Sequence, residues 1–224
     1  HVVLALDSSG SMAASMTAVL QSARDFIQGL PDQTVIQVID FDSGIRLLPG
    51  NQKEEVLQSL NQVRAEGATT LYDATLQGLE LLEDKERPTL VVFTDGVDSN
   101  TENNGSGSKA NKQDVEKAVL AAGIPLYTIG FGEGHDAETM MELAEMSGGT
   151  YFSATDTQVL DLVFTAINQR LGNQYVAVYE RPEEIAPSDT PVISIAVDVI
   201  IVSTKSKIYC IPLFSKHRSQ ASCN

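Results

Sequence analysis

Three short segments of the 224-residue chain carry oxygen-bearing side chains with no basic residue beside them. They are residues 7–11 (DSSGS), 67–70 (GATT) and 94–96 (TDG). Carboxylate and hydroxyl oxygens, without nitrogen or sulfur, are the ligands that hard cations such as Mg²⁺, Mn²⁺ and Ca²⁺ prefer. The segments therefore predict a divalent-cation site, provided that the fold brings them together.

The hydrophobic pattern predicts a fold that can do this. Apolar, strand-like runs alternate with segments whose apolar residues recur at helical spacings. The expected strands are residues 2–6, 34–41, 45–48, 89–94, 125–131 and 150–153, and the expected helices are residues 14–30, 53–64, 72–82, 112–122, 137–146 and 157–171. This alternation is typical of a doubly wound, Rossmann-like α/β domain with a mostly parallel sheet. Residues 45–48 follow too closely for a crossover, so we expect an antiparallel edge strand there.

The segments lie where such a fold places its ligands. In an open α/β sheet the ligand site lies beyond the carboxyl ends of the strands, where the strand order reverses. Asp7 follows the first strand and Asp95 follows the strand at 89–94. A reversal between these strands would place the two carboxylates on opposite walls of one crevice. The alternate spacing of Asp7, Ser9 and Ser11 lets their side chains turn toward one point, and Gly10 permits the bend.

Taken together, the three segments resemble a known motif. The stretches DSSGSM, GATTLYDA and FTDGVDSN resemble the metal ion dependent adhesion site (MIDAS) of von Willebrand factor A (VWA) domains. Matched residue by residue, the implied metal ligands are Asp7, Ser9, Ser11, Thr69 and Asp95. The Gly-x-Thr spacing favours Thr69 over the neighbouring Thr70. The resemblance covers roughly residues 1–171.

The resemblance carries further implications. It implies a parallel sheet with one antiparallel edge strand, and a last helix that shifts between closed and open arrangements. The stretch ELAEMSGGTYFSATD and the later NQYVAVYERP are similar to exported bacterial members of the family in which a β segment follows. This likeness favours an extracytoplasmic or cell-surface location.

Ligand counting indicates how such a site would work. Mg²⁺ takes about six oxygens, and three hydroxyls with one or two carboxylates leave at least one position to water. A carboxylate from an Asp or Glu of a protein partner can take that position. We therefore expect a non-enzymatic, metal-dependent protein-binding or adhesion module.

Two other functions fit parts of the pattern. A Mg²⁺-dependent phosphotransferase also uses an aspartate after its first strand, but it needs a second acid two residues on, where Ser9 stands, or a lysine in the motif. The histidines, His1, His135 and His217, have no nucleophile or carboxylate partner in the pattern, which argues against a catalytic triad. A scaffold subunit of an intracellular chelatase or ATPase assembly remains open.

Several acidic and hydroxyl residues also have plainer interpretations. Residues 7–11 alone could cap a helix. Asp40 and Asp42 are expected to be turn residues, with a supporting role at the site as the alternative. Asp73 is expected to hydrogen-bond backbone amides of the Thr69 loop and so to support it.

The loops after the strands at 89–94 and 125–131 are expected to be structural. Residues 101–111 form a polar, Gly/Ser-rich stretch that predicts a solvated, mobile loop. Asp98, Asn100, Glu102 and Asn103 lack the ligand pattern of a calcium-binding loop and are expected to be solvated loop residues instead. Residues 130–134 (GFGEG) lack the glycine spacing of a dinucleotide-binding loop and are expected to form a strand-exit turn.

Composition limits partners and location. Thirty acidic residues against fifteen basic ones give a net charge of −15, which disfavours binding to nucleic acid or anionic membranes. No stretch approaches the about 20 apolar residues of a membrane span. Residues 1–172 are expected to form the VWA domain, 173–202 a β appendage, and 203–224, with Cys210 and Cys223, an irregular tail. Because His1 leads directly into a strand without a signal peptide, we expect a piece of a longer protein.

Overall fold

The computed structural model describes residues 1–102 and 104–172. Within this part, residues His1–Gln169 form one compact unit. The predicted β appendage at 173–202, the tail at 203–224 and the two cysteines lie outside the described residues.

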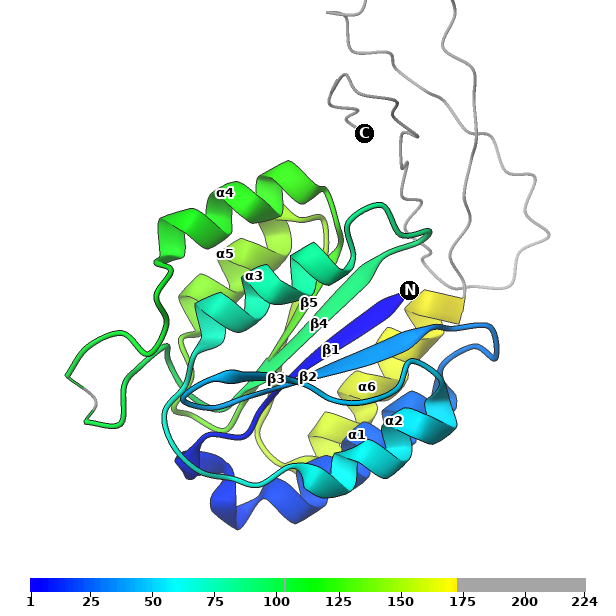
Figure 1. Ribbon diagram of the computed structural model, residues 1–224, viewed down its shortest axis with the longest axis horizontal. Coiled ribbons are helices and arrows are strands. Elements are labelled where there is room, and N and C mark those ends of the chain that lie inside the picture. Colours follow the sequence, from blue (N-terminus) through cyan, green and yellow to red (C-terminus); the bar gives the residue numbers. More distant parts are fainter. Residues whose placement is uncertain (103, 173–224) are drawn as a thin grey trace, which may run out of the picture. The chain divides into compact units, whose positions relative to one another are not determined.

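A six-stranded sheet forms the centre of the domain (Figure 1). Its strands are β1 (Val2–Asp7), β2 (Ile36–Phe41), β3 (Ile45–Leu47), β4 (Thr89–Thr94), β5 (Leu126–Phe131) and β6 (Thr150–Ala154). Their order across the sheet is β3-β2-β1-β4-β5-β6, and every pair is parallel except β2 with β3. The structure confirms the predicted mostly parallel sheet with one antiparallel edge strand.

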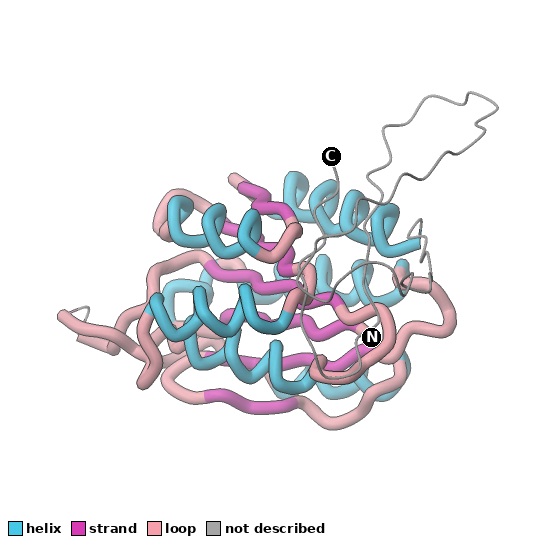
Figure 2. Tube along the Cα trace, turned by 90° about the horizontal axis from the view of Figure 1, so that it is seen from above, coloured by secondary structure: helices cyan, strands magenta, loops and turns pink. Residues whose placement is uncertain are grey.

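Helices cover both faces of the sheet. The helices are α1 (Met16–Gly29), α2 (Lys53–Ser59), α3 (Leu71–Leu81), α4 (Lys112–Ala122), α5 (Ala137–Met146) and α6 (Thr157–Gly172). Figure 1 shows α3, α4 and α5 on one face and α1, α2 and α6 on the other, and Figure 2 gives the view from above, with helices in front of the strands. All residues of β1 and β4 are buried, as the continuous apolar runs predicted.

Aromatic and polar contacts join α1 and α6, which lie on the same face of the sheet. The rings of Phe26 on α1 and Phe164 on α6 stack with their centroids 4.7 Å apart. Asn168 of α6 donates a hydrogen bond from Nδ2 to the carbonyl oxygen of Phe26 at 3.0 Å. These contacts pack α6 against α1.

Two helices differ from their predicted bounds by more than one residue. The helix expected at 14–30 begins at Met16, after a separate 3₁₀ turn at Gly10–Ala14, and ends at Gly29. Leu30 is extended, because the residue before a proline disfavours the helical conformation. The helix expected at 53–64 ends at Ser59 and continues only as a 3₁₀ turn, Leu60–Gln62.

The strand order reverses between β1 and β4, which is the condition under which Asp7 and Asp95 were expected to share one crevice. These strands are direct neighbours, with Leu6 paired to Phe93. After β1 the chain crosses to α1 on one face, and after β4 it crosses to α4 on the other (Figure 1). The carboxyl ends of β1 and β4 therefore form the place where a doubly wound fold leaves a crevice.

Candidate functional site

Asp7 is fixed between the ends of the two central strands. It is the last residue of β1, and it is fully buried. Its Oδ1 accepts a hydrogen bond from the backbone N–H of Ser9 at 2.7 Å, and its Oδ2 accepts one from Thr94 Oγ1 at 2.5 Å. The Thr94 hydroxyl in turn accepts the N–H of Gly96 at 3.1 Å. Asp7 thus ties the loop after β1 to the loop after β4.

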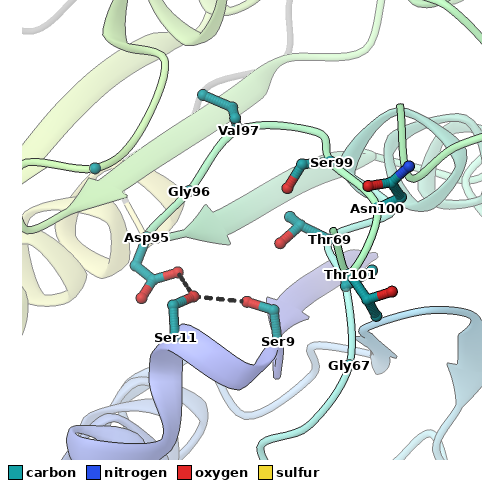
Figure 3. A pocket seen from close by; sticks show the side chains of 12 residues that line it. Ser9, Ser11, Gly67, Thr69, Asp95, Gly96, Val97, Ser99, Asn100 and Thr101 are labelled. Carbon is teal, nitrogen blue, oxygen red and sulfur yellow. Dashed lines mark hydrogen bonds between the residues drawn. The ribbon is translucent and has the colours of Figure 1, made fainter. Parts of the chain in front are cut away.

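A row of three oxygen-bearing side chains runs across the crevice (Figure 3). The hydroxyls of Ser9 and Ser11 lie 3.0 Å apart, and Ser11 Oγ donates to Asp95 Oδ1 at 2.7 Å. Ser9 stands at the start of the 3₁₀ turn, but its side chain makes no capping hydrogen bond. The helix-cap interpretation is therefore wrong for Ser9, and its hydroxyl belongs to the row that ends at Asp95.

Thr69 enters the site from a third segment. Its backbone forms an isolated antiparallel bridge with Ser99, with N–H···O distances of 2.9 and 3.1 Å. The carbonyl oxygen of Gly67, a residue with φ of +75°, accepts the N–H of Gly10 at 3.1 Å. Thr69 as a whole residue is only 5% exposed, and its hydroxyl has no hydrogen-bond partner among the described residues.

These side chains line a pocket of about 410 Å³. Its lining comprises Ser9, Ser11, Gly67, Ala68, Thr69, Asp95, Gly96, Val97, Ser99, Asn100, Thr101 and Gly134. Four of the five residues predicted as ligands therefore line one cavity, whereas Asp7 is fully buried and is not among the lining residues. No lysine or arginine lines the pocket.

The neighbouring Thr70 is separate from the pocket lining. Its Oγ1 is buried and has no hydrogen-bond partner in the described part of the chain. Because an unpaired buried hydroxyl is costly, Thr70→Val should raise the free energy of unfolding by about 1 kcal/mol. Urea denaturation would measure this, with Thr89→Val as the matched change at another unpaired buried hydroxyl. A loss of stability in Thr70→Val, with a gain in Thr89→Val, would contradict the expectation.

The β2–β3 hairpin supports the site from behind. Buried Asp40 accepts a hydrogen bond from Ser8 Oγ at 2.5 Å, next to Asp7, and forms an ion pair with Arg46 at 2.9 Å. Asp42 accepts the N–H of Gly44 at 3.0 Å, as predicted for a turn residue, and also pairs with Arg46 at 2.7 Å. Asp40 therefore contributes to positioning the loop after β1, the alternative weighed for it above.

The β4–α4 loop is more ordered by hydrogen bonds than its composition predicted. Asp98 accepts hydrogen bonds from the backbone N–H groups of Tyr72, Gly107 and Ser108, at 3.1, 2.9 and 3.0 Å. It also accepts the hydroxyl of Ser106 at 2.5 Å and that of Ser108. The prediction of a plainly solvated residue is wrong for Asp98, which holds the loop together.

Asp73 supports a different loop from the predicted one. Its carboxylate accepts the N–H groups of Lys109 and Ala110 at 3.0 and 2.9 Å, both in the β4–α4 loop. The prediction that it binds amides of the Thr69 loop is wrong, because the side chain at the start of α3 reaches the neighbouring loop instead. Asp73 and Asp98 thus both hold the β4–α4 loop.

Burial is the largest influence on the pKa of both carboxylates of the site. Burial raises the pKa of Asp7 to about 6, against hydrogen bonds from Thr94 and Ser9 that lower it. Burial also raises the pKa of Asp95, which the hydrogen bond from Ser11 partly offsets. Among the described residues, no three or more His, Cys, Asp or Glu side chains form a metal-binding group. The other donors of a cation here are hydroxyls.

Some lining residues could not be recognised in the sequence. Ser99, Asn100 and Thr101 come to the pocket through the Thr69–Ser99 bridge, a backbone contact without a side-chain signature. Gly134, in the expected strand-exit turn, also lines it. His135 beside it has Nε2 2.6 Å from the Tyr151 hydroxyl.

Comparisons with known proteins agree with this architecture. The family model for the von Willebrand factor type A domain matches residues 1–166. A UPF0353 protein of Nocardia farcinica is 21% identical over 210 residues, which cover 76% of this chain and 63% of that protein. The chain therefore spans about three fifths of the length of the curated relatives it matches.

Solved structures share the fold. A von Willebrand factor type A protein from Catenulispora acidiphila superposes with a TM-score of 0.66 at 18% identity, covering 79% of this chain and 43% of that one. Proximal thread matrix protein 1 from the mussel byssus, solved with a zinc-occupied MIDAS motif, gives 0.60 at 15% identity, covering 75% and 46%. From the match over residues 1–166 and the fold, this chain belongs to the von Willebrand factor type A domain family.

Proposed function

We propose that this domain is a metal-dependent protein-binding module that recognises an acidic residue of its partner. The divalent cation, Mg²⁺ or alternatively Mn²⁺ or Ca²⁺, would be held by Asp7, Ser9, Ser11, Thr69 and Asp95. The observation that carries the proposal is that Ser9, Ser11, Thr69 and Asp95, from three separate segments, line one pocket, and that the Thr69 hydroxyl has no hydrogen-bond partner among the described residues. A ligand in the pocket would satisfy this oxygen and the row from Ser9 to Asp95 together.

The residues present fit a hard divalent cation. All donors are carboxylate or hydroxyl oxygens, which favour Mg²⁺, Mn²⁺ or Ca²⁺ over softer metals. Once bound, the ion would supply the positive charge that Asp7 and Asp95 lack and an attachment point for an external carboxylate. The likeness to a structure with a zinc-occupied MIDAS motif supports a divalent ion without identifying it.

The protein's own residues would set the geometry of binding. Thr94 and the Ser9 amide hold the Asp7 carboxylate in place, so little ordering remains to be done on binding. Three of the donors are neutral hydroxyls, which leave the charge of a 2+ ion incompletely balanced. An Asp or Glu of the partner is then attracted through the open side of the pocket.

A non-enzymatic role agrees with the family and with the pocket. The phosphotransferase alternative needs an acid where Ser9 stands or a lysine at the site, and no lysine lines the pocket. A scaffold subunit of an intracellular chelatase or ATPase assembly would use the same domain for assembly. No observation at the site favours this role over partner binding. We propose the adhesion role, at an extracytoplasmic or cell-surface location. No helix of the described residues is long and apolar enough to cross a membrane.

Titration calorimetry of the full chain with Mg²⁺, Mn²⁺ and Ca²⁺ tests the proposal. We expect one saturable site in the wild type and a loss of at least about tenfold in affinity for Thr69→Ala, because one ligand is removed. Thr165→Ala is the matched control, since its hydroxyl lies on α6 and bonds only to the Asp161 carbonyl oxygen. Equal affinities of the two variants would overturn the assignment of Thr69.

Recognition of a carboxylate needs a separate measurement. A random peptide library selected on the immobilised chain should be enriched in Asp or Glu at one position in Mg²⁺, and should lose this enrichment in chelator. Enrichment that is the same with and without the cation would mean that the domain binds partners without the metal.

A further inference from the structure

The β4–α4 loop contains the Asn-Gly pair of the chain, Asn104-Gly105. Both residues are exposed. In such a pair the backbone nitrogen of the glycine can attack the side-chain carbonyl carbon of the asparagine, because glycine has no Cβ to obstruct the approach. Every other asparagine of the described residues is followed by a residue with a side chain. Asn104 is therefore the asparagine most open to this reaction.

The attacking nitrogen is not held by a hydrogen bond. The N–H of Gly105 has no hydrogen-bond partner among the described residues, whereas the carbonyl oxygen of Gly105 accepts the N–H of Asn100 at 2.9 Å. A nitrogen without an acceptor can lose its proton to water and turn toward the neighbouring side chain without first breaking a hydrogen bond. The loop thus leaves the nucleophile of the reaction free.

The side-chain amide of Asn104 lies in a hydrogen-bonded turn. Its Oδ1 accepts a hydrogen bond from Asn100 Nδ2 at 2.8 Å, and its Nδ2 donates to Glu102 Oε2 at 2.7 Å. When a nitrogen adds to the amide carbon, negative charge develops on Oδ1, and the donor from Asn100 already points at that oxygen. The bond to Glu102 joins two exposed residues, so water can replace either partner.

We propose that Asn104 is a site of spontaneous deamidation. The nitrogen of Gly105 forms a bond to Cγ of Asn104 and gives its proton to water, and the amide nitrogen leaves as ammonia. The product is a five-membered succinimide ring, which water then opens at either carbonyl. Opening at the side-chain carbonyl gives aspartate, and opening at the backbone carbonyl gives isoaspartate. Water is the only co-reactant, and nothing is oxidised or reduced.

The isoaspartate product does not fit the present turn. Its backbone runs through the former side chain and gains one CH₂ between positions 104 and 105. Two hydrogen bonds span this point, from Asn100 N–H to the Gly105 carbonyl oxygen at 2.9 Å and from Asn104 N–H to Asn100 Oδ1 at 3.2 Å. Asn100 lines the candidate pocket (Figure 3), so the modification loosens a residue of that lining. The inference rests on the loop alone and holds whether or not the pocket binds a cation.

Ageing the purified full chain at mildly alkaline pH, followed by peptide mapping with mass spectrometry, tests the inference. The peptide with Asn104 should gain the mass of an amide-to-acid exchange and separate into aspartate and isoaspartate forms. Asn51 is the internal reference, because it is exposed but is followed by Gln52. Asn104 should react at least about tenfold faster than Asn51. Equal rates at the two asparagines would overturn the inference.

Gly105→Ala is the matched variant. Gly105 does not have a positive φ, and an added Cβ would lie 3.3 Å from Asn100 Nδ2, the end of a flexible side chain, so the loop can accept alanine. The methyl group obstructs the approach of the nitrogen to Cγ, and deamidation of Asn104 should slow by at least about tenfold. An unchanged rate would show that Gly105 is not the nucleophile.

Amide hydrogen exchange by NMR measures the effect on the turn. The N–H groups of Asn100 and Glu102 should lose protection in the aged chain, whereas that of Ser99, which donates to the Thr69 carbonyl oxygen at 3.1 Å, should keep it. Asn104→Asp adds the charge without the extra CH₂ and still offers an acceptor to Asn100, so it should keep protection at all three. Equal protection in fresh and aged chains would overturn the loosening of the pocket lining.

Discussion

The cation-free domain is expected to lose stability as the pH rises from about 4 to about 6. The pKa of Asp7 is raised by burial from its ordinary 3.8 to about 6. Between these values the folded state holds the proton that the unfolded state has released, so stability falls as pH increases. The full effect is about 3 kcal/mol, present below about pH 4 and lost above about pH 6. The raised pKa of Asp95 acts in the same direction.

Urea unfolding in chelator between pH 4 and pH 8 measures this effect, with Asp7→Asn as the reference. The variant cannot ionise at this position, while the other carboxyls titrate alike in both proteins and cancel in the difference. The variant's advantage should therefore grow from near zero at pH 4 to about 3 kcal/mol at pH 7. Parallel stability profiles would show that Asp7 ionises without cost and that its burial is balanced in another way. Saturating Mg²⁺ should remove the loss of stability that the wild type shows as the pH rises, because cation binding favours the ionised folded state.

Asp7→Asn should also weaken divalent-cation binding by at least about 100-fold, even though it stabilises the cation-free domain. The amide keeps the shape of the carboxylate but loses its charge. It can still accept the Ser9 N–H, and the Thr94 hydroxyl has a second acceptor in the Gly96 carbonyl oxygen at 3.4 Å. A substitution that raises the stability of the cation-free domain but lowers its cation affinity indicates that the residue serves binding rather than folding.

Calorimetric titration of Mg²⁺ into this variant and into Asp25→Asn makes the comparison. Asp25 is an exposed residue of α1 that accepts only a hydrogen bond from Gln21, so its loss should leave affinity nearly unchanged. Equal affinities of the two variants would mean that Asp7 is a structural residue. A large loss of stability in Asp7→Asn would likewise contradict the account of its charge.

The pattern of apolar runs was sufficient to predict the sheet and the crevice at the ends of β1 and β4. Asp7 and Asp95 could be assigned to one crevice because Asp7 ends one fully buried strand and Asp95 directly follows another, and a doubly wound fold has its crevice where the strand order reverses. Ser9 and Ser11 followed from alternate spacing after β1. These inferences depend on strand ends, which buried apolar runs mark clearly.

The surroundings of the site could not be predicted, because they depend on contacts between loops. Ser99 reaches the pocket through backbone hydrogen bonds to Thr69, and any residue type can make such bonds. Asp73 and Asp98 looked like ordinary loop and helix-start residues until the path of the β4–α4 loop placed five amides and hydroxyls around Asp98. Sequence spacing carries no information on that path. The β appendage and the tail stay predictions.

The central claim is that a divalent cation binds in the pocket between β1 and β4, and paramagnetic NMR with Mn²⁺ tests it most directly. Substoichiometric Mn²⁺ broadens the signals of nearby nuclei with a steep dependence on distance. The amide signals of Ser9, Thr69 and Gly96 should disappear first, those of Ala23 in α1 and Val119 in α4 should persist, and excess Mg²⁺ should restore the spectrum. Broadening that is uniform, or that centres on exposed acidic residues away from the pocket, would contradict the claim.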